Sequence, residues 1–146
     1  KKTLSFDPTN VQVLSALGWA YMSKGAFKEA EAAILEELKL GGRVPFLLVD
    51  LAFCYGYQGD LDRAKQVLDE VQEASKSQPA SAWAWSIAYL PLALRDEKYR
   101  EVFFRWMNES ARAHSFWQVY TGNFYYVSLH TDPRWLAYRN LLKLPP

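Results

Sequence analysis

Two stretches of the chain, LGWAYMSKGAFKEA at residues 17–30 and LAFCYGYQGDLDRA at residues 51–64, decide the fold. They lie 34 residues apart and share leucine, tyrosine, glycine and alanine at corresponding positions. In each stretch an apolar segment is followed by a glycine and then by a charged segment. Glycine adopts the left-handed backbone angles of a tight turn without steric cost. The spacing therefore predicts two helical hairpins in tandem.

Small residues at fixed positions predict that the two helices of each hairpin pack closely. Gly18 and Ala52 lie in the first helix of each hairpin, and Ala30 and Ala64 lie in the second. Larger side chains at these positions would push the helix axes apart.

This pattern resembles the tetratricopeptide repeat. The first copy has every signature position of that family, in Leu17-Gly18-x-x-Tyr21-x-x-x-Gly25-x-Phe27-x-x-Ala30. The second copy differs only by conservative exchanges, and the resemblance covers residues 11–78. It implies an all-α fold, a right-handed α-solenoid of helical hairpins closed by a C-terminal capping helix.

The resemblance also divides the chain, which we expect to form a single tetratricopeptide-like domain. We expect the tail of a preceding repeat at residues 1–10, two complete repeats at 11–44 and 45–78, a degenerate third repeat at 79–112, and an aromatic segment with a capping helix at 113–146. Pro8 stands where the repeat-closing proline of the family falls. We therefore expect the chain to derive from a longer array or a larger protein.

The third repeat departs from the pattern. No glycine occupies its turn, and Pro91 falls within its first helix, where proline removes a hydrogen bond and kinks the axis. We expect Pro91 to interrupt that helix, and the charged helix to begin again at Glu97 and run to Arg112 after a short insertion. The residues expected to face inward on it are Val102, Phe103, Trp106 and Met107.

The C-terminal part combines an aromatic segment at 113–131 with a final helix. Asp132 and Pro133 predict the start of this helix, because an N-cap acid is followed by proline in the first turn. Its apolar face is expected to hold Trp135, Tyr138, Leu141 and Leu142. The ending resembles the tail that closes tetratricopeptide regions of some bacterial transcriptional regulators and signalling proteins, through Asp132-Pro133-Arg134-Trp135.

Charge is distributed unequally between the two kinds of helix. The first helices, expected at 11–24, 45–58 and 79–92, contain one, one and no charged residues. The second helices, expected at 27–40 and 61–74, contain six each. A helix that is apolar nearly all round must be covered on more than one side or expose an apolar surface.

In tetratricopeptide proteins the first helices line the concave wall of the solenoid. That geometry, carried over to this chain, implies an apolar groove that suits an amphipathic helix or an extended apolar segment. The residues expected to line the groove are Trp19, Met22, Phe46, Val49, Phe53, Tyr57, Trp83 and Ile87. Three of them, Trp19, Phe53 and Ile87, are expected to form a file with one member in each repeat.

The resemblance implies a non-catalytic protein-protein interaction module. We expect this module to belong to a larger bacterial protein that is cytoplasmic and regulates transcription. The expected partner is a peptide or a domain of another protein. Two alternatives stay open. The chain's own aromatic segment, residues 114–129, could fill the groove and make the domain structural, or its outer surfaces could mediate self-association.

Composition excludes several other classes of protein. Lys and Arg number 17 against 16 for Asp and Glu, a net charge of +1, which lacks the positive surface of a nucleic-acid-binding domain. No apolar run reaches the length of about 18 residues expected of a membrane span. The single cysteine, Cys54, excludes an internal disulfide, suits a reducing compartment, and is expected to be a small core residue.

No combination of residues indicates catalysis, a metal site or a cofactor. His114 and His130 have no metal-ligand or nucleophile partner at a diagnostic spacing. The pairs Glu36-Glu37 and Asp69-Glu70 are expected on solvated helix faces.

Asp50 is the only charged residue of its expected helix. Because an unpaired buried charge is costly, we expect Asp50 to find a basic or backbone partner, and Arg43 is a candidate nearby in sequence.

Overall fold

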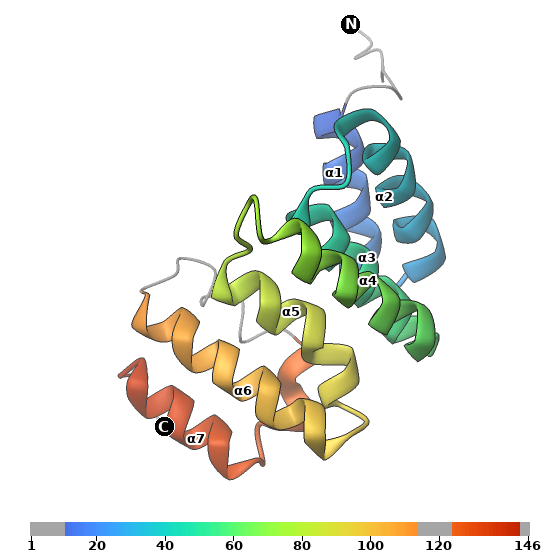
Figure 1. The fold of residues 1–146 in the computed structure, drawn as a ribbon. Helices are drawn as coiled ribbons and strands as arrows, with labels where there is room; N and C mark the ends of the chain where they lie inside the picture. The colour runs from blue at the N-terminus through green and yellow to red at the C-terminus, as the bar shows by residue number, and fades with distance from the viewer. Residues whose placement is uncertain (1–10, 114–123, 144–146) are drawn as a thin grey trace, which may run out of the picture. The chain divides into compact units, whose positions relative to one another are not determined.

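The computed structural model describes residues 11–113 and 124–143, and every regular element within them is a helix (Figure 1). The all-α fold class is therefore confirmed. The elements are α1 (Val11–Ser23), α2 (Phe27–Gly41), α3 (Pro45–Gln58), α4 (Leu61–Ala74), α5 (Ala82–Ala93), α6 (Glu97–Arg112), the 3-10 helix η2 (Phe124–Leu129) and α7 (Pro133–Leu141). The chain divides into unit 1, Lys1–Pro79, and unit 2, Ala80–Pro146.

Unit 1 contains two helical hairpins, in which α1 packs on α2 and α3 packs on α4, while α2 and α3 join the hairpins (Figure 1). Gly25 and Gly59 form the two hairpin turns with φ angles of 73° and 85°. These left-handed angles confirm the turns predicted from the sequence. Helix α2 ends at Gly41, and the following Gly42 has a φ of 83° and donates its N–H to the carbonyl of Leu38.

The small residues of the repeat allow close approach of α1 and α2, as the sequence predicted. A Cβ atom added to Gly18 would lie 3.3 Å from Cγ1 of Ile34 on α2, which is tighter than ordinary van der Waals contact. Ala30, Ala52 and Ala64 are almost completely buried. A larger side chain at any of these positions would have to displace its neighbours.

Burial follows the predicted segregation of charge. Helix α3 is buried along most of its length, and Phe46 is its one exposed residue. Helices α2 and α4 each bury a single stripe and turn their charged residues outward, with one exception described below. Each leucine removed from water in this core contributes about 1.5–3 kcal/mol.

Unit 2 contains a third hairpin, α5 on α6, followed by α7, which packs on α6. Helix α6 spans Glu97–Arg112, the range that the sequence predicted. Asp132 caps α7 by accepting a hydrogen bond from the Arg134 N–H at 3.0 Å, and Pro133 is the first helical residue. The predicted start of the last helix is confirmed.

The expected interruption at Pro91 is wrong. Helix α5 continues through Pro91 and ends at Ala93. Proline removes one helical hydrogen bond, but near the C-terminal end of a helix few later turns depend on it. The side chain is buried, and the Pro91 carbonyl accepts a hydrogen bond of 2.7 Å from the Arg95 guanidinium.

The connection that leads into the third hairpin is longer than the connection that leads into the second. The second helices of the hairpins begin at Phe27, Leu61 and Glu97, so the second interval is two residues longer than the first. Residues 75–81 connect α4 to α5, whereas only 42–44 connect α2 to α3.

The inward faces of α6 and α7 are partly as expected. On α6, Phe103 and Met107 are buried, and Phe104 is buried as well, although the sequence had not singled it out. The expected residues Val102 and Trp106 are only half-buried.

On α7, Trp135 and Tyr138 are buried, whereas Leu141 is exposed; Leu142, which follows the helix, is half-buried. The assignment of Leu141 to the apolar face is wrong, since it is the last residue of α7 and lies at an uncovered helix end.

Within the described ranges, no helix combines the length and the apolar character needed to cross a membrane.

Candidate functional site

Two residues of the expected groove, Trp19 on α1 and Phe46 on α3, form an exposed aromatic pair in unit 1. Their ring centroids lie 6.4 Å apart with an interplanar angle of 29°. The side chains are 39% and 48% exposed. No exposed residue of α1 or α3 is charged. The Trp19–Phe46 pair therefore presents an apolar surface to solvent.

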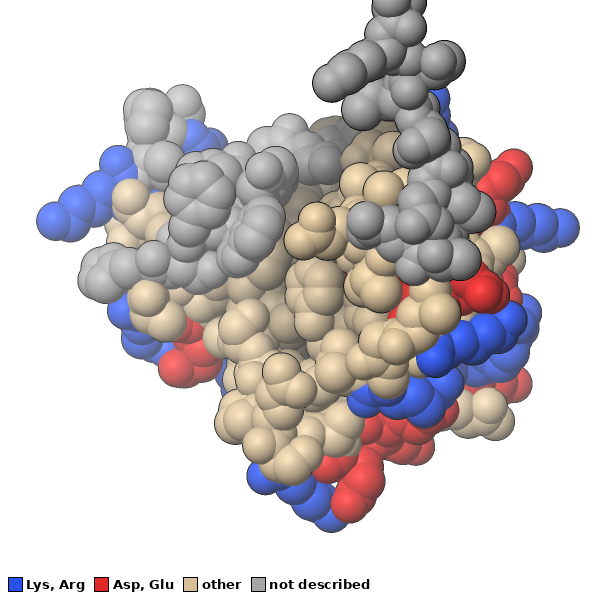
Figure 2. Space-filling view, turned by 90° about the horizontal axis from the view of Figure 1, so that it is seen from above, with Lys and Arg blue, Asp and Glu red and all other residues tan. Residues whose placement is uncertain are grey.

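Charged side chains lie in groups on the surface. Figure 2 shows Lys, Arg, Asp and Glu side chains beside one another on the face that it draws. Ion pairs such as Arg43–Glu70 and Lys39–Glu36 are exposed. Exposed pairs of this kind contribute little to stability.

A second aromatic cluster of unit 1 joins the two hairpins. Phe53 and Tyr57 on α3 lie 6.2 Å and 4.9 Å from the ring of Phe27, the first residue of α2, and 4.6 Å from each other. Phe53 is buried and Tyr57 is half-buried. Met22 and Val49, also expected in the groove, are buried too. In the structure these side chains contribute to packing, and little of their surface is open to a partner.

The two groove residues of unit 2 have separate surroundings. Trp83 is buried, and its ring lies 6.5 Å from that of Tyr126 in η2. Tyr126 in turn contacts the rings of Phe103 and Trp135. Ile87 is half-buried. A residue of the chain's own aromatic segment thus contacts Trp83. Residues 114–123 of that segment lie outside the described residues.

The file of Trp19, Phe53 and Ile87 was expected to run through three repeats, and its members belong to both units. It stays a prediction.

Comparison of the chain with models of protein families, with characterised proteins and with solved structures found no match. A function must be inferred from the residues themselves.

Asp50 lies in the core of unit 1, and its expected pairing with Arg43 is wrong. Arg43 instead binds Glu70 on α4, with Nε and Nη2 at 2.8 Å and 2.5 Å from Oε2. Burial, and then the negative charge of Glu37, raise the pKa of the Asp50 carboxyl well above its ordinary value.

Glu37 is a further correction, because it is buried and not solvated. The hydroxyl of Ser15 on α1 donates a hydrogen bond to its carboxylate. Its neighbour Glu36 points outward and pairs with Lys39 at 2.8 Å. Adjacent residues of a helix face directions about 100° apart, so only one of two consecutive glutamates can reach solvent freely here. The pair Asp69-Glu70 is exposed, as expected.

Cys54 follows Asp50 by one helical turn and is fully buried, which confirms the predicted core role. Burial, with smaller contributions from the charges of Asp50 and Glu31, raises the pKa of the thiol. A thiol that stays protonated is a poor nucleophile.

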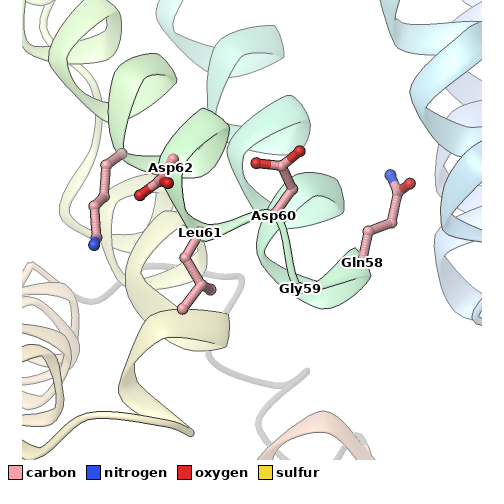
Figure 3. A pocket seen from close by; sticks show the side chains of 6 residues that line it. Gln58, Gly59, Asp60, Leu61 and Asp62 are labelled. Carbon is pink, nitrogen blue, oxygen red and sulfur yellow. The ribbon is translucent and has the colours of Figure 1, made fainter.

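A surface depression of about 550 Å³, open to solvent, lies at the α3–α4 turn. Figure 3 shows that the side chains of Gln58, Asp60 and Asp62 point in different directions and do not converge. The Asp60 carboxylate is already engaged, because it caps α4 through the Arg63 N–H at 3.0 Å and binds the Arg63 guanidinium at 2.6 Å. This arrangement offers no nucleophile beside a base.

The described residues contain no group of three or more His, Cys, Asp or Glu side chains placed to hold a metal ion. His130 is exposed, and its ring packs 4.5 Å from that of Trp135. His114 lies outside the described residues.

Sequence reasoning missed a row of aromatic side chains on the α5–α6 hairpin. The row, called the α5–α6 aromatic row, consists in order of Trp106, Trp85, Tyr89 and Tyr99, with centroid separations of 5.7, 6.2 and 6.2 Å. A signal was present, because residues four apart on α5 and seven apart on α6 share a helix face. All four side chains are half-buried.

Proposed function

We propose that this chain is a non-catalytic protein-protein interaction module whose Trp19–Phe46 pair contacts a partner polypeptide. In this proposal its hairpins form a right-handed, tetratricopeptide-like α-solenoid. The observation that carries the proposal is the exposure of two adjacent aromatic rings, 39% and 48%, on helices whose exposed residues carry no charge.

The exposed aromatic surface is large enough to matter for binding. Aromatic side chains bury about 150–250 Å² each, so the exposed fractions of Trp19 and Phe46 correspond to about 170 Å². At about 25 cal/mol per Å², covering them would contribute about 4 kcal/mol before the costs of association. Tryptophan is enriched among the residues that dominate interface energies. The absence of charge at the exposed positions of α1 and α3 favours an apolar partner surface, such as one side of an amphipathic helix.

The solenoid is supported by the repeat itself. Corresponding glycines form both turns of unit 1, and corresponding small residues bring the helices together. The resemblance of the chain's ending to the tails of some bacterial regulators extends the proposal to a cytoplasmic regulatory protein, in which this module recruits a partner.

A second candidate function is a structural or oligomerisation domain. One observation favours it, the contact between the rings of Trp83 and Tyr126, a residue of the chain's own aromatic segment. It predicts that surfaces other than the Trp19–Phe46 pair mediate any association.

Photo-crosslinking tests the proposal most directly. A benzophenone amino acid at position 46, expressed in the source cells, is expected to crosslink to a polypeptide that mass spectrometry can identify. The same amino acid at position 36, on the charged face of α2, is the matched control. Trp19→Ser is expected to reduce the crosslink at position 46 at least tenfold without changing the far-UV circular dichroism.

The proposal fails if position 46 yields no more crosslinked protein than position 36. A crosslink only to a second copy of the chain would favour the oligomerisation domain.

A further inference from the structure

Helices α1 and α3 begin 34 residues apart and occupy corresponding places in the two hairpins of unit 1. On α3 one face is buried apart from a half-buried tyrosine, and α2 of the preceding hairpin packs on this helix. On α1 the corresponding face is exposed along its whole length. This face, called the α1 outer face, consists of Ala16, Trp19, Ala20 and Ser23, which correspond to Asp50, Phe53, Cys54 and Tyr57 on α3.

The contacts between α2 and α3 show what kind of helix fits such a face. Phe27, the first residue of α2, places its ring 6.2 Å from that of Phe53 and 4.9 Å from that of Tyr57. Four residues later, the Glu31 carboxylate accepts a hydrogen bond of 2.8 Å from the side-chain amide of Gln58. The helix that covers α3 thus offers an aromatic ring and, one turn later, a carboxylate.

The first hairpin holds groups that can receive the same two contacts. Trp19 stands at the place of Phe53, and the small Ser23, in place of a tyrosine, leaves room for an incoming ring. Lys24 stands at the place of Gln58, is exposed, and forms no ion pair with another described residue. A hydrogen bond between an ammonium group and a carboxylate is stronger than one from a neutral amide.

We propose that the partner polypeptide binds the α1 outer face with an amphipathic helix, which packs on α1 as α2 packs on α3. This helix carries an aromatic residue in its first turn, which contacts Trp19, and an acidic residue four positions later, which pairs with Lys24. The inference rests on the proposed function and names the element with which the partner contacts the Trp19–Phe46 pair.

The charges around this end of the hairpin favour an acidic residue on the partner. In the template contact Arg63 also binds Glu31, at 3.2 Å. Its counterpart on the first hairpin is Glu29, which has the opposite charge, but Lys28 beside it is also exposed. Together with Lys24 these two residues give a net charge of +1, which attracts a carboxylate and repels a second cation.

Small side chains let the partner helix come close. Ala16 and Ala20 lie one turn apart on the α1 outer face, and both are exposed. Small residues at a helix crossing reduce the distance between the two axes. Because the face itself carries no charge, the remaining contact side of the partner helix must be apolar.

A direct test uses the full chain and a fluorescent, helix-stabilised peptide with the sequence of residues 26–41. Leucine replaces Glu37 in this peptide, because a carboxylate there would meet an apolar surface. Anisotropy titration is expected to show saturable binding. Phe27→Ala in the peptide and Trp19→Ser in the chain are each expected to weaken binding about tenfold or more.

Two measurements on the unmodified chain locate the peptide. Its addition is expected to shift the indole N–H resonance of Trp19. The reactivity of the Cys54 thiol is expected to stay unchanged, because the peptide adds to α1 and leaves α2 in place on α3. Neither measurement depends on the folding of a variant.

The acidic residue is tested by charge reversal. Glu31→Lys in the peptide is expected to weaken binding by the natural chain about twofold to fivefold, the range of an exposed ion pair. The chain variant Lys24→Glu is expected to prefer the Glu31→Lys peptide to the original one. Lys65→Glu, which alters an exposed lysine of α4, is the matched control and is expected to keep the original preference.

Four results would overturn the inference. These are equal binding of the Phe27→Ala peptide, an unreversed preference of Lys24→Glu, a rise in Cys54 reactivity on binding, and a dimer in sedimentation that Trp19→Ser dissociates. The last result would assign the α1 outer face to a second copy of the chain. The first three would leave the proposed function untouched, since crosslinking at position 46 detects any partner polypeptide, whatever its structure.

Discussion

Replacing Asp50 by asparagine is expected to make unit 1 more stable at neutral pH and to remove a pH dependence. Asp50 is 3% exposed, and burial together with the charge of Glu37 raises its pKa well above the ordinary value. Asparagine has nearly the shape of a protonated aspartate and never ionises. The variant therefore keeps the packing of α3 and removes the titration.

The sign of the effect follows from proton binding. In the unfolded chain Asp50 titrates near its ordinary pKa, whereas in the folded chain it holds its proton to higher pH. Between these two values the folded state binds more protons, so the free energy of unfolding falls as pH rises. The slope is at most about 1.4 kcal/mol per pH unit. Asp50 thus favours folding most at pH below its ordinary pKa, and this contribution is lost as pH rises towards the folded-state pKa.

Urea denaturation at pH 5, 6 and 7 measures the effect. The stability of Asp50→Asn relative to the natural chain is expected to increase with pH, by up to about 3 kcal/mol over this range. Other titrating groups cancel in this difference. Glu37→Gln is the matched companion, because removal of its negative charge lowers the Asp50 pKa and should reduce the slope. Parallel pH profiles of the natural chain and Asp50→Asn would refute the raised pKa of Asp50.

Two further predictions concern packing and capping. Gly18→Leu should lower the free energy of unfolding by about 1–3 kcal/mol, because even a Cβ would crowd Ile34. Ala16→Leu, at an exposed position of the same helix, should change it by less than about 0.5 kcal/mol. Equal effects of the two variants in urea denaturation would contradict the close approach of α1 and α2. Asp132→Ala should destabilise unit 2 by about 1–2 kcal/mol, since Asp132 caps α7 and binds the Arg134 side chain at 2.7 Å. Asp132→Asn should retain most of the cap. Thermal unfolding in which both variants match the natural chain would exclude a capping role.

The repeats were predictable because their determinants are local. Glycine at a turn and small residues at a helix crossing impose steric conditions that only a few residue types satisfy, and Gly25, Gly59 and Gly18 meet them in the structure. The start of α7 was predictable for the same reason, because a capping side chain acts over two or three residues.

Pro91 and Glu37 show where local reasoning failed. The cost of a proline in a helix depends on how many turns follow it, and α5 ends two residues later. Glu37 belongs to the buried stripe of α2 that includes Ala30, Ala33 and Ile34. Its place in the i, i+3, i+4, i+7 spacing is readable in the sequence, and this phase decides its burial in spite of the six charged residues of the helix.

The candidate surface was predictable only in part. Phe46 and Phe53 lie on the same helix and look equivalent in the sequence, yet one is 48% and the other 5% exposed. The difference arises because Phe27 of the preceding hairpin contacts Phe53, whereas Phe46 meets Trp19 at the surface. Such contacts depend on how helices from separate hairpins meet, which no pattern within one repeat specifies.

Cys54 is a natural probe of local unfolding in this protein. The thiol is fully buried in the middle of α3, and the chain contains no other cysteine. A thiol reagent can therefore react only with molecules in which α3 has transiently opened. When closing is fast compared with modification, the labelling rate gives the free energy of that opening without any engineered label. Comparing this rate with and without a bound partner would measure how much a partner at the surface of unit 1 reduces the opening of α3.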